Sequence, residues 1–271
     1  DAYQVLGTMS QRIEAVSKLY QGLGGAVALF SEEIKNSNGA VIAFQRGLGF
    51  TEEQLQGVAT VAMSSGKSLV EVQTEIANQA IQLGATFGIP KKLIGKDVAE
   101  MINDIDTFGN MTVKQMAKTS VYAKKLGVDV KKMAGVFKAF NNFEDAAIGA
   151  AKLSQAFGMN IDVVKQLKAA SPAEVIEDLR TAFFNAGKDA ANLNRHELAL
   201  LATQSGLDQE TAKRVFSLEN QGVAYEDIAN KADDAESAQL TAANAMKQVA
   251  KDIKKIVHEV LKMDGAFAEF R

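Results

Sequence analysis

A short pattern that recurs along the chain constrains its fold more than any other feature. An apolar residue, or Ser in one copy, precedes a Gly and a second apolar residue, and a helix-capping residue usually follows. The copies are Leu48-Gly49-Phe50-Thr51, Phe87-Gly88-Ile89-Pro90, Leu126-Gly127-Val128-Asp129, Phe157-Gly158-Met159-Asn160, Ser205-Gly206-Leu207-Asp208 and a weaker Gln221-Gly222-Val223. Gly just past a helix end adopts the left-handed conformation of a Schellman motif, and Thr, Asp or Asn then caps the next helix. We therefore expect helix elbows at Gly49, Gly88, Gly127, Gly158 and Gly206.

The remaining sequence supports an all-α fold. Hydrophobic residues make up 47% of the 271 residues, only two are Pro, and runs of β-branched residues with a period of two are missing. The pattern predicts an array of short helices joined by Gly elbows and flanked by longer, heptad-patterned helices. We expect helices near residues 40–48, 52–64, 68–87, 91–106, 112–126, 130–139, 143–157, 161–169, 172–187, 194–205 and 208–219. Asn142, Ser171-Pro172 and Asn194 indicate capped helix starts.

Three regions follow from these patterns. Residues 1–38 carry a heptad seam that Gly22, Gly24 and Gly25 weaken, and residues 39–223 contain the elbows and predict a compact helical domain. Residues 224–271 have apolar residues at alternating steps of three and four, which predicts a long coiled-coil-like helix. The expected oligomer seam consists of Met246, Val249, Ile253, Ile256 and Val260.

The seam leaves two arrangements open. β-Branched residues at both core positions favour three or more strands, so we expect the full-length protein to form a homo-oligomer of at least three chains. A wide apolar stripe also allows this helix to fold back onto the compact domain.

A search for chemistry finds no constellation of catalytic residues. Cys is absent, so thiol chemistry and thiolate metal sites are excluded, and His196 and His258 lie far apart in the sequence. Glu236-Ser237 has the dipeptide found at the acid of lytic transglycosylases, but its neighbours do not match that fold. Net charge is −3, which argues against stable nucleic-acid binding. We expect no enzyme activity, no cofactor and no metal site.

Residues 112–222 contain an ordered series of sequence blocks. They include Thr112-Val113-Lys114-Gln115-Met116-Ala117, Tyr122 through Val128, Phe137 through Ala147, Ala151 through Asn160, Ser171-Pro172-Ala173-Glu174, Arg180 through Lys188, Leu198 through Ala202, and Gly206-Leu207. This order resembles the tape measure proteins of long-tailed bacteriophages, especially those with contractile tails. The resemblance covers roughly 40% of the chain, and its specificity lies in the order of the blocks.

The resemblance implies a structural virion protein. Such proteins set the tail length inside the tail tube and leave the tail during DNA ejection, so a location in the tail lumen after synthesis in the bacterial host cytoplasm is expected. The implied partners are further copies of the chain, the tail tube and the baseplate hub, with membrane contact only during ejection.

Two other classes of function remain open. A helical adaptor would bind partner helices in a groove, and a tail domain associated with a cell-wall hydrolase is the third possibility. Because the chain begins at Asp1 without Met and ends within an apolar pattern, we expect it to be an internal fragment of a longer protein.

Overall fold

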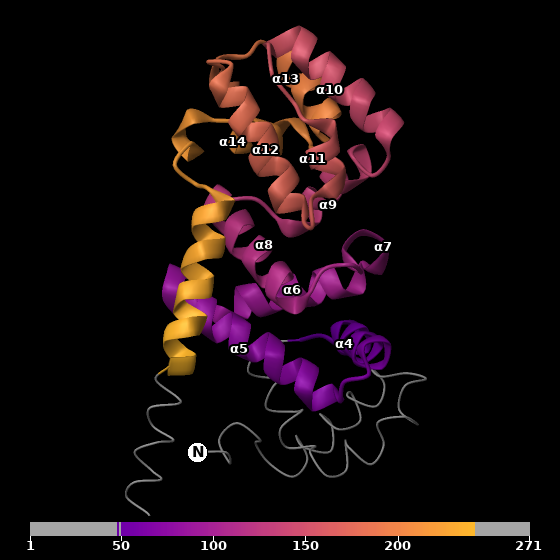
Figure 1. Ribbon diagram of the computed structural model, residues 1–271, viewed down its shortest axis with the longest axis vertical. Coiled ribbons are helices and arrows are strands. Elements are labelled where there is room, and N and C mark those ends of the chain that lie inside the picture. Colours follow the sequence, from indigo (N-terminus) through magenta and orange to yellow (C-terminus); the bar gives the residue numbers. More distant parts are fainter. Residues whose placement is uncertain (1–47, 49, 242–271) are drawn as a thin grey trace, which may run out of the picture. The chain divides into compact units, whose positions relative to one another are not determined.

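The computed structural model describes residue 48 and residues 50–241, and all regular elements in this part of the chain are helices. The predicted all-α class is therefore confirmed. In chain order the elements are α4 (Glu52–Ser65), α5 (Leu69–Phe87), α6 (Lys91–Asn103), α7 (Ile105–Phe108), α8 (Val113–Leu126), α9 (Val130–Ala139), α10 (Phe143–Phe157), α11 (Val163–Lys168), α12 (Pro172–Asn185), η2 (Ala190–Asn192), α13 (Arg195–Ser205), α14 (Gln209–Val215) and η3 (Leu218–Asn220) (Figure 1). A further helix covers residues 225–241 as far as the chain is described.

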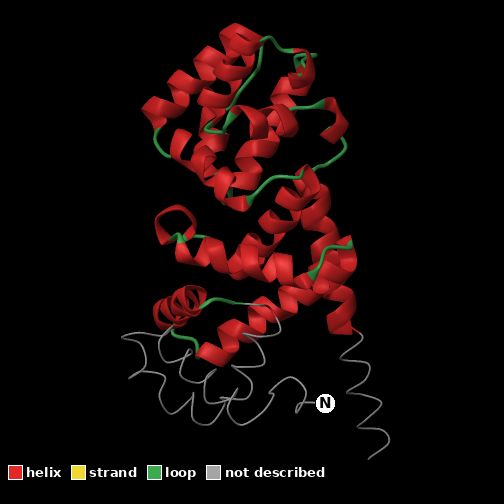
Figure 2. Cartoon of the chain, turned by 180° about the vertical axis from the view of Figure 1, so that it is seen from behind, coloured by secondary structure: helices red, strands yellow, loops and turns green. Residues whose placement is uncertain are grey.

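Four of the five predicted elbows lie in the described residues, and each has the expected geometry. Gly88, Gly127, Gly158 and Gly206 follow the ends of α5, α8, α10 and α13 with φ between 68° and 74°. At Gly127 the Schellman hydrogen bond is present, because the N–H of Val128 donates to the carbonyl of Ala123 over 2.9 Å. Short loops therefore join the helices, as Figure 2 shows.

The elbow pattern missed two glycine turns and included one glycine that does not form such a turn. Gly66 and Gly187 also have positive φ, at 67° and 70°, although no apolar residue follows either of them. Gly222 is not among the glycines with positive φ, so the weaker copy of the pattern was wrong. Gly49 lies outside the described residues.

Side-chain caps begin most of the predicted helices. Thr51 and Thr112 form capping boxes with Gln54 and Gln115, and Asn194 forms one with Glu197. Ser171, with Pro172 in the first helical position, caps α12 as predicted. Asn160 was the wrong cap for α11, because Asp162 accepts the hydrogen bond from the N–H of Lys165 over 3.0 Å.

Two predicted helices are shorter than expected. The predicted helix 91–106 ends at Asn103, because Asp104 leaves the helical region with ψ of 70° and caps the short α7 through the N–H of Thr107. The predicted helix 208–219 ends at Val215, and a separate 3-10 turn follows at Leu218–Asn220. In both cases the apolar pattern of the sequence continues past the residue at which the helix ends.

Apolar side chains hold α4, α5, α6 and α8 together. Helices α5 and α6 each contact the other three, and α4 and α8 each contact α5 and α6. The side chains on their inward faces are fully buried. The buried positions include Leu55 and Val58 of α4, Leu69, Ile76 and Leu83 of α5, Val98 and Ile102 of α6, and Val121 of α8. Burial of each such side chain stabilises the fold by roughly 1.5–3 kcal/mol.

The helices from α9 to α14 pack around an aromatic centre on α12. The ring of Phe183 makes edge contacts with Phe157 of α10 and Phe216 after α14, with ring centroids 5.7 and 5.3 Å apart. Contacts of α12 with α8 and of α9 with α6, α7 and α8 connect these helices to the preceding ones. Both sets of helices therefore belong to one compact unit.

The distribution of contacts divides the chain into two compact units, with the boundary after Ala229. The helix that begins at residue 225 continues past this boundary. The predicted boundaries after residues 38 and 223 remain predictions. The flank 1–38, most of the predicted helix 40–48 and residues 242–271 lie outside the described residues.

Candidate functional site

Of the residues considered for chemistry, the structure describes His196 and Glu236, which belong to different helices. His196 is exposed in the first turn of α13, where its N–H donates to the Oδ1 of Asn194 over 2.9 Å. Glu236 lies within the helix 225–241, with its side chain partly exposed. His258 and the five seam residues Met246, Val249, Ile253, Ile256 and Val260 lie outside the described residues.

The most highly connected polar side chain in the described part of the chain is Arg180 on α12. It is 1% exposed, although Arg is rarely buried without partners. Its Nε donates to the carbonyl of Val215 over 2.9 Å, and its Nη1 donates to the carbonyl of Val223 over 2.6 Å. Nη2 donates to the carbonyl of Asn220. One guanidinium thus binds three main-chain oxygens between the end of α14 and the start of the helix at residue 225.

Three further side chains complete the Arg180 cluster, which we define as Tyr122, Glu177, Arg180 and Tyr225. Nη1 of Arg180 lies 2.9 Å from both the Oη of Tyr122 and the Oε2 of Glu177, and the Tyr122 hydroxyl donates to the same carboxylate over 2.6 Å. The Tyr225 ring makes an edge contact with Tyr122, with ring centroids 5.5 Å apart.

The charge on Arg180 is therefore balanced by one carboxylate and by oriented dipoles. The guanidinium also lies 5.8 Å from the ring of Tyr122 and 5.4 Å from that of Phe184. Burial raises the pKa of the Tyr122 hydroxyl well above its usual value, although the charge on Arg180 opposes this shift. Tyr122 stays neutral and remains a hydrogen-bond donor at physiological pH.

The sequence analysis missed the role of Arg180, although a signal for it was present. Arg180 stands four residues after Ile176 and three residues before Phe183, and both are buried. It therefore occupies the apolar stripe of α12, where a charged residue requires partners. Helical periodicity marks the position, but the partners come from segments up to 58 residues away.

A second buried polar group joins α6 to α8. Asp97 is 4% exposed, and its carboxylate accepts hydrogen bonds from the Oγ of Ser120 over 2.7 Å and the Nζ of Lys124 over 3.0 Å. Burial raises the pKa of Asp97, and the hydrogen bonds from Ser120 and Lys124 oppose this shift. The arrangement ties two helices together.

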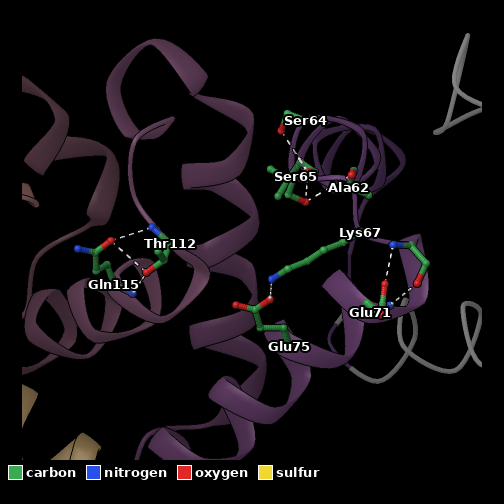
Figure 3. A network of polar contacts seen from close by, with 10 residues as sticks. Ala62, Ser64, Ser65, Lys67, Glu71, Glu75, Thr112 and Gln115 are labelled. Carbon is green, nitrogen blue, oxygen red and sulfur yellow. Dashed lines mark hydrogen bonds and ion pairs between the residues drawn. The ribbon is translucent and has the colours of Figure 1, made fainter.

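A cleft of about 370 Å³ opens between α4, α5, α7 and α8. Val61, Val72, Ile102, Met111 and Met116 supply much of its apolar lining. Its polar lining is satisfied within the protein (Figure 3): Ser64 and Ser65 donate to the carbonyl of Val61, and Lys67 pairs with Glu75 over 2.6 Å. This cleft can accommodate an apolar group but presents few unused polar atoms.

A wider cleft of about 650 Å³ lies between α7, α9 and α11. Phe137, Phe140, Lys138 and Asp106 are among its lining residues. Gln166, also in its lining, has a buried Oε1 without a hydrogen-bond partner in the described part of the chain. Because that oxygen is covered by neighbouring atoms, the cleft does not present it to a ligand.

Residues 48 and 50–241 contain neither a metal-binding group of side chains nor a helix suited to crossing a membrane. These residues contain no group of three or more His, Asp or Glu side chains placed to hold a metal ion. Among the described helices, none combines the length and the apolar character that crossing a membrane requires.

Comparison of the chain with known protein families, curated proteins and solved structures found no match.

Proposed function

We propose that the chain is part of a structural protein of the tape measure type from a long-tailed bacteriophage. It would set the tail length inside the tail tube and leave during DNA ejection. The ordered resemblance over residues 112–222 carries this proposal. Those blocks supply the helices from α8 to α14, and they contribute turns at Gly127, Gly158 and Gly206 together with Tyr122 and Arg180 of the buried cluster.

The use of these residues supports a structural role. The conspicuous polar residues of the blocks form helix caps and buried ties between helices. Arg180 of the blocks directs its hydrogen bonds at main-chain oxygens, and Asp97 of the preceding helix α6 accepts hydrogen bonds from Ser120 and Lys124 of α8. We therefore propose no catalytic activity for this part of the protein.

The proposal extends to assembly. The heptad pattern of residues 224–271 suits a homo-oligomer of three or more chains in the full-length protein, with the tail tube and baseplate hub as further partners. Sedimentation equilibrium on a chain extended past Arg271 tests the assembly. A strict monomer at high micromolar concentration would refute the oligomer and leave the seam as intramolecular packing.

The central test changes the length of the protein. A helix rises about 1.5 Å per residue, so inserting 84 residues of matching heptads into the full-length protein should lengthen the tail by about 130 Å. Electron microscopy of the particles measures this change, and Arg214→Met in the same protein is the control for altered sequence at constant length. Longer protein incorporated into tails of unchanged length would reject the ruler function.

One observation favours a helical adaptor as the second candidate. The cleft between α4, α5, α7 and α8 has an apolar lining of the kind that receives side chains from an amphipathic helix. Binding of a discrete amphipathic peptide that is lost in Val61→Lys, but retained in the distant Arg214→Met variant, would favour the adaptor. A protein that binds no such peptide would favour the tape measure proposal.

A further inference from the structure

The segment between α14 and the helix at residue 225 is fastened in an unusual way. Residues 217–224 are exposed or only partly buried, and η3 contains no buried residue. Leu218 is 47% exposed, so its side chain does not anchor the segment in the core. Apolar burial alone therefore holds these residues weakly.

Main-chain hydrogen bonds to Arg180 replace the missing apolar anchors. The three carbonyls that Arg180 binds belong to Val215, Asn220 and Val223, which mark the beginning, middle and end of the segment. Tyr225 adds an aromatic contact two residues after the last of them. A planar guanidinium with five N–H donors can make these contacts at once, whereas an ammonium group is a single point.

One side of this arrangement faces water. The bonds from Arg180 to Val215 and Tyr122 are fully buried, but those to Asn220, Val223 and Glu177 are only partly buried. Glu177 retains 23% side-chain exposure. Water can therefore compete first for the bonds that hold the second half of the segment.

We propose that Arg180 is a releasable latch that fastens residues 217–224, and with them the first turn of the helix 225–241, to the compact unit. Opening the latch frees residues 217–228 as a group, while α5, α6 and α8 stay folded on their own apolar core. This property belongs to the fold and does not depend on the function proposed above.

Native-state hydrogen exchange of the complete 271-residue chain tests the latch without any substitution. The N–H groups of Asn220, Val223 and Ile228 donate to main-chain carbonyls and report on the segment. They should exchange through a small opening with little dependence on denaturant, whereas amides of α5 and α8 should require global unfolding. Exchange of both sets with the same free energy and denaturant slope would overturn the proposal.

Substitution provides the second arm. Arg180→Met should raise the exchange rate of these three amides by roughly 100-fold more than that of α5 amides, because several hydrogen bonds from one charged donor are lost together. The control Arg214→Met also removes a donor to a distant carbonyl, that of Gly127, but from an exposed side chain. It should change exchange in residues 217–228 by less than about threefold.

The outcomes separate a latch from a residue that merely stabilises the core. An equal rise in α5 and in residues 217–228, or no rise in either, would overturn the proposal. If Arg180→Met does not fold, Glu177→Gln weakens the same cluster while keeping its shape. It should give a smaller rise confined to residues 217–228, and an equal rise in the α5 amides would count against the latch.

Discussion

Helix α12 carries two side chains, Phe183 and Arg180, that are buried to the same degree and held by different forces. Phe183 lies in an aromatic centre with Phe157 and Phe216, where non-directional packing against neighbouring rings supplies the stability. Arg180, three residues earlier, lies in a polar cluster whose stability depends on the direction of each donor. Equal burial therefore does not imply equal tolerance. The aromatic centre requires volume, whereas the Arg180 cluster requires a particular set of N–H groups.

The largest expected effect is at Arg180. Arg180→Met should lower the free energy of unfolding by about 3–5 kcal/mol, since it leaves main-chain carbonyls without their donor and the Glu177 carboxylate without its balancing positive charge. Arg180→Lys should recover only part of this loss, because one ammonium cannot reach three carbonyls. Denaturant titration measures both variants. Full recovery by Lys would show that charge, not donor geometry, holds the cluster.

Phe183 should show the opposite response to a conservative change. Phe183→Ala should also cost about 3–5 kcal/mol, because a cavity forms among the rings. Phe183→Leu keeps most of the volume and should cost less than about 1.5 kcal/mol. The comparison fails if Phe183→Leu is as damaging as Arg180→Lys in the same titration.

Two elbows sharpen the comparison at the level of the backbone. A Cβ on Gly206 would lie 2.2 Å from the carbonyl oxygen of Gly135, whereas one on Gly158 would meet no atom within 4 Å. Both have positive φ. Gly158→Ala should therefore cost about 1 kcal/mol for the left-handed conformation alone, and Gly206→Ala should cost roughly 1–3 kcal/mol more. Equal shifts in melting temperature would contradict this reading of the crowded elbow.

Alkaline pH should affect the polar cluster and leave the aromatic centre unchanged. The pKa of Tyr122 is raised in the folded state, so the native protein keeps a proton that the unfolded chain loses. The stabilisation from Tyr122 is thus complete below pH 10, the ordinary tyrosine pKa, and declines as pH rises further. Tyr122→Phe should flatten this decline in unfolding titrations between pH 9 and about 11. An identical decline in the variant would assign it to other groups.

Acid pH should reveal the smallest effect, at a surface cap. Two hydrogen bonds from Thr211 lower the pKa of Asp208 to about 2. Its contribution is present above the ordinary pKa of 3.8 and is lost as pH falls toward 2. Because the side chain is 47% exposed, we expect less than about 1 kcal/mol. Asp208→Asn keeps a good cap and should remove this pH dependence, and a retained acid transition would exclude Asp208 as its source.

Local features of the sequence predicted much of the helical framework. Gly127 and Gly158 were identified as elbows because Gly adopts the left-handed conformation without a steric penalty. Thr112 and Ser171 were identified as caps because their side chains accept hydrogen bonds from main-chain N–H groups three residues later. These interactions span a few residues, so the sequence nearby contains all the information they need. Where a local signal was ambiguous, as at Asp104 and Phe216, the predicted helix ran past its observed end.

Tertiary structure alone decided which distant groups meet. Gly135 and Gly206 touch through their backbones, and Arg180 reaches Tyr122 and Val223, because helix packing brings together segments that have no periodic relation in the sequence. The sequence by itself determined most of the points where helices turn, since each turn depends on the conformational freedom and side-chain oxygens of a few adjacent residues. It did not determine what the buried guanidinium binds, because those partners are main-chain oxygens, which every residue carries and no residue type marks.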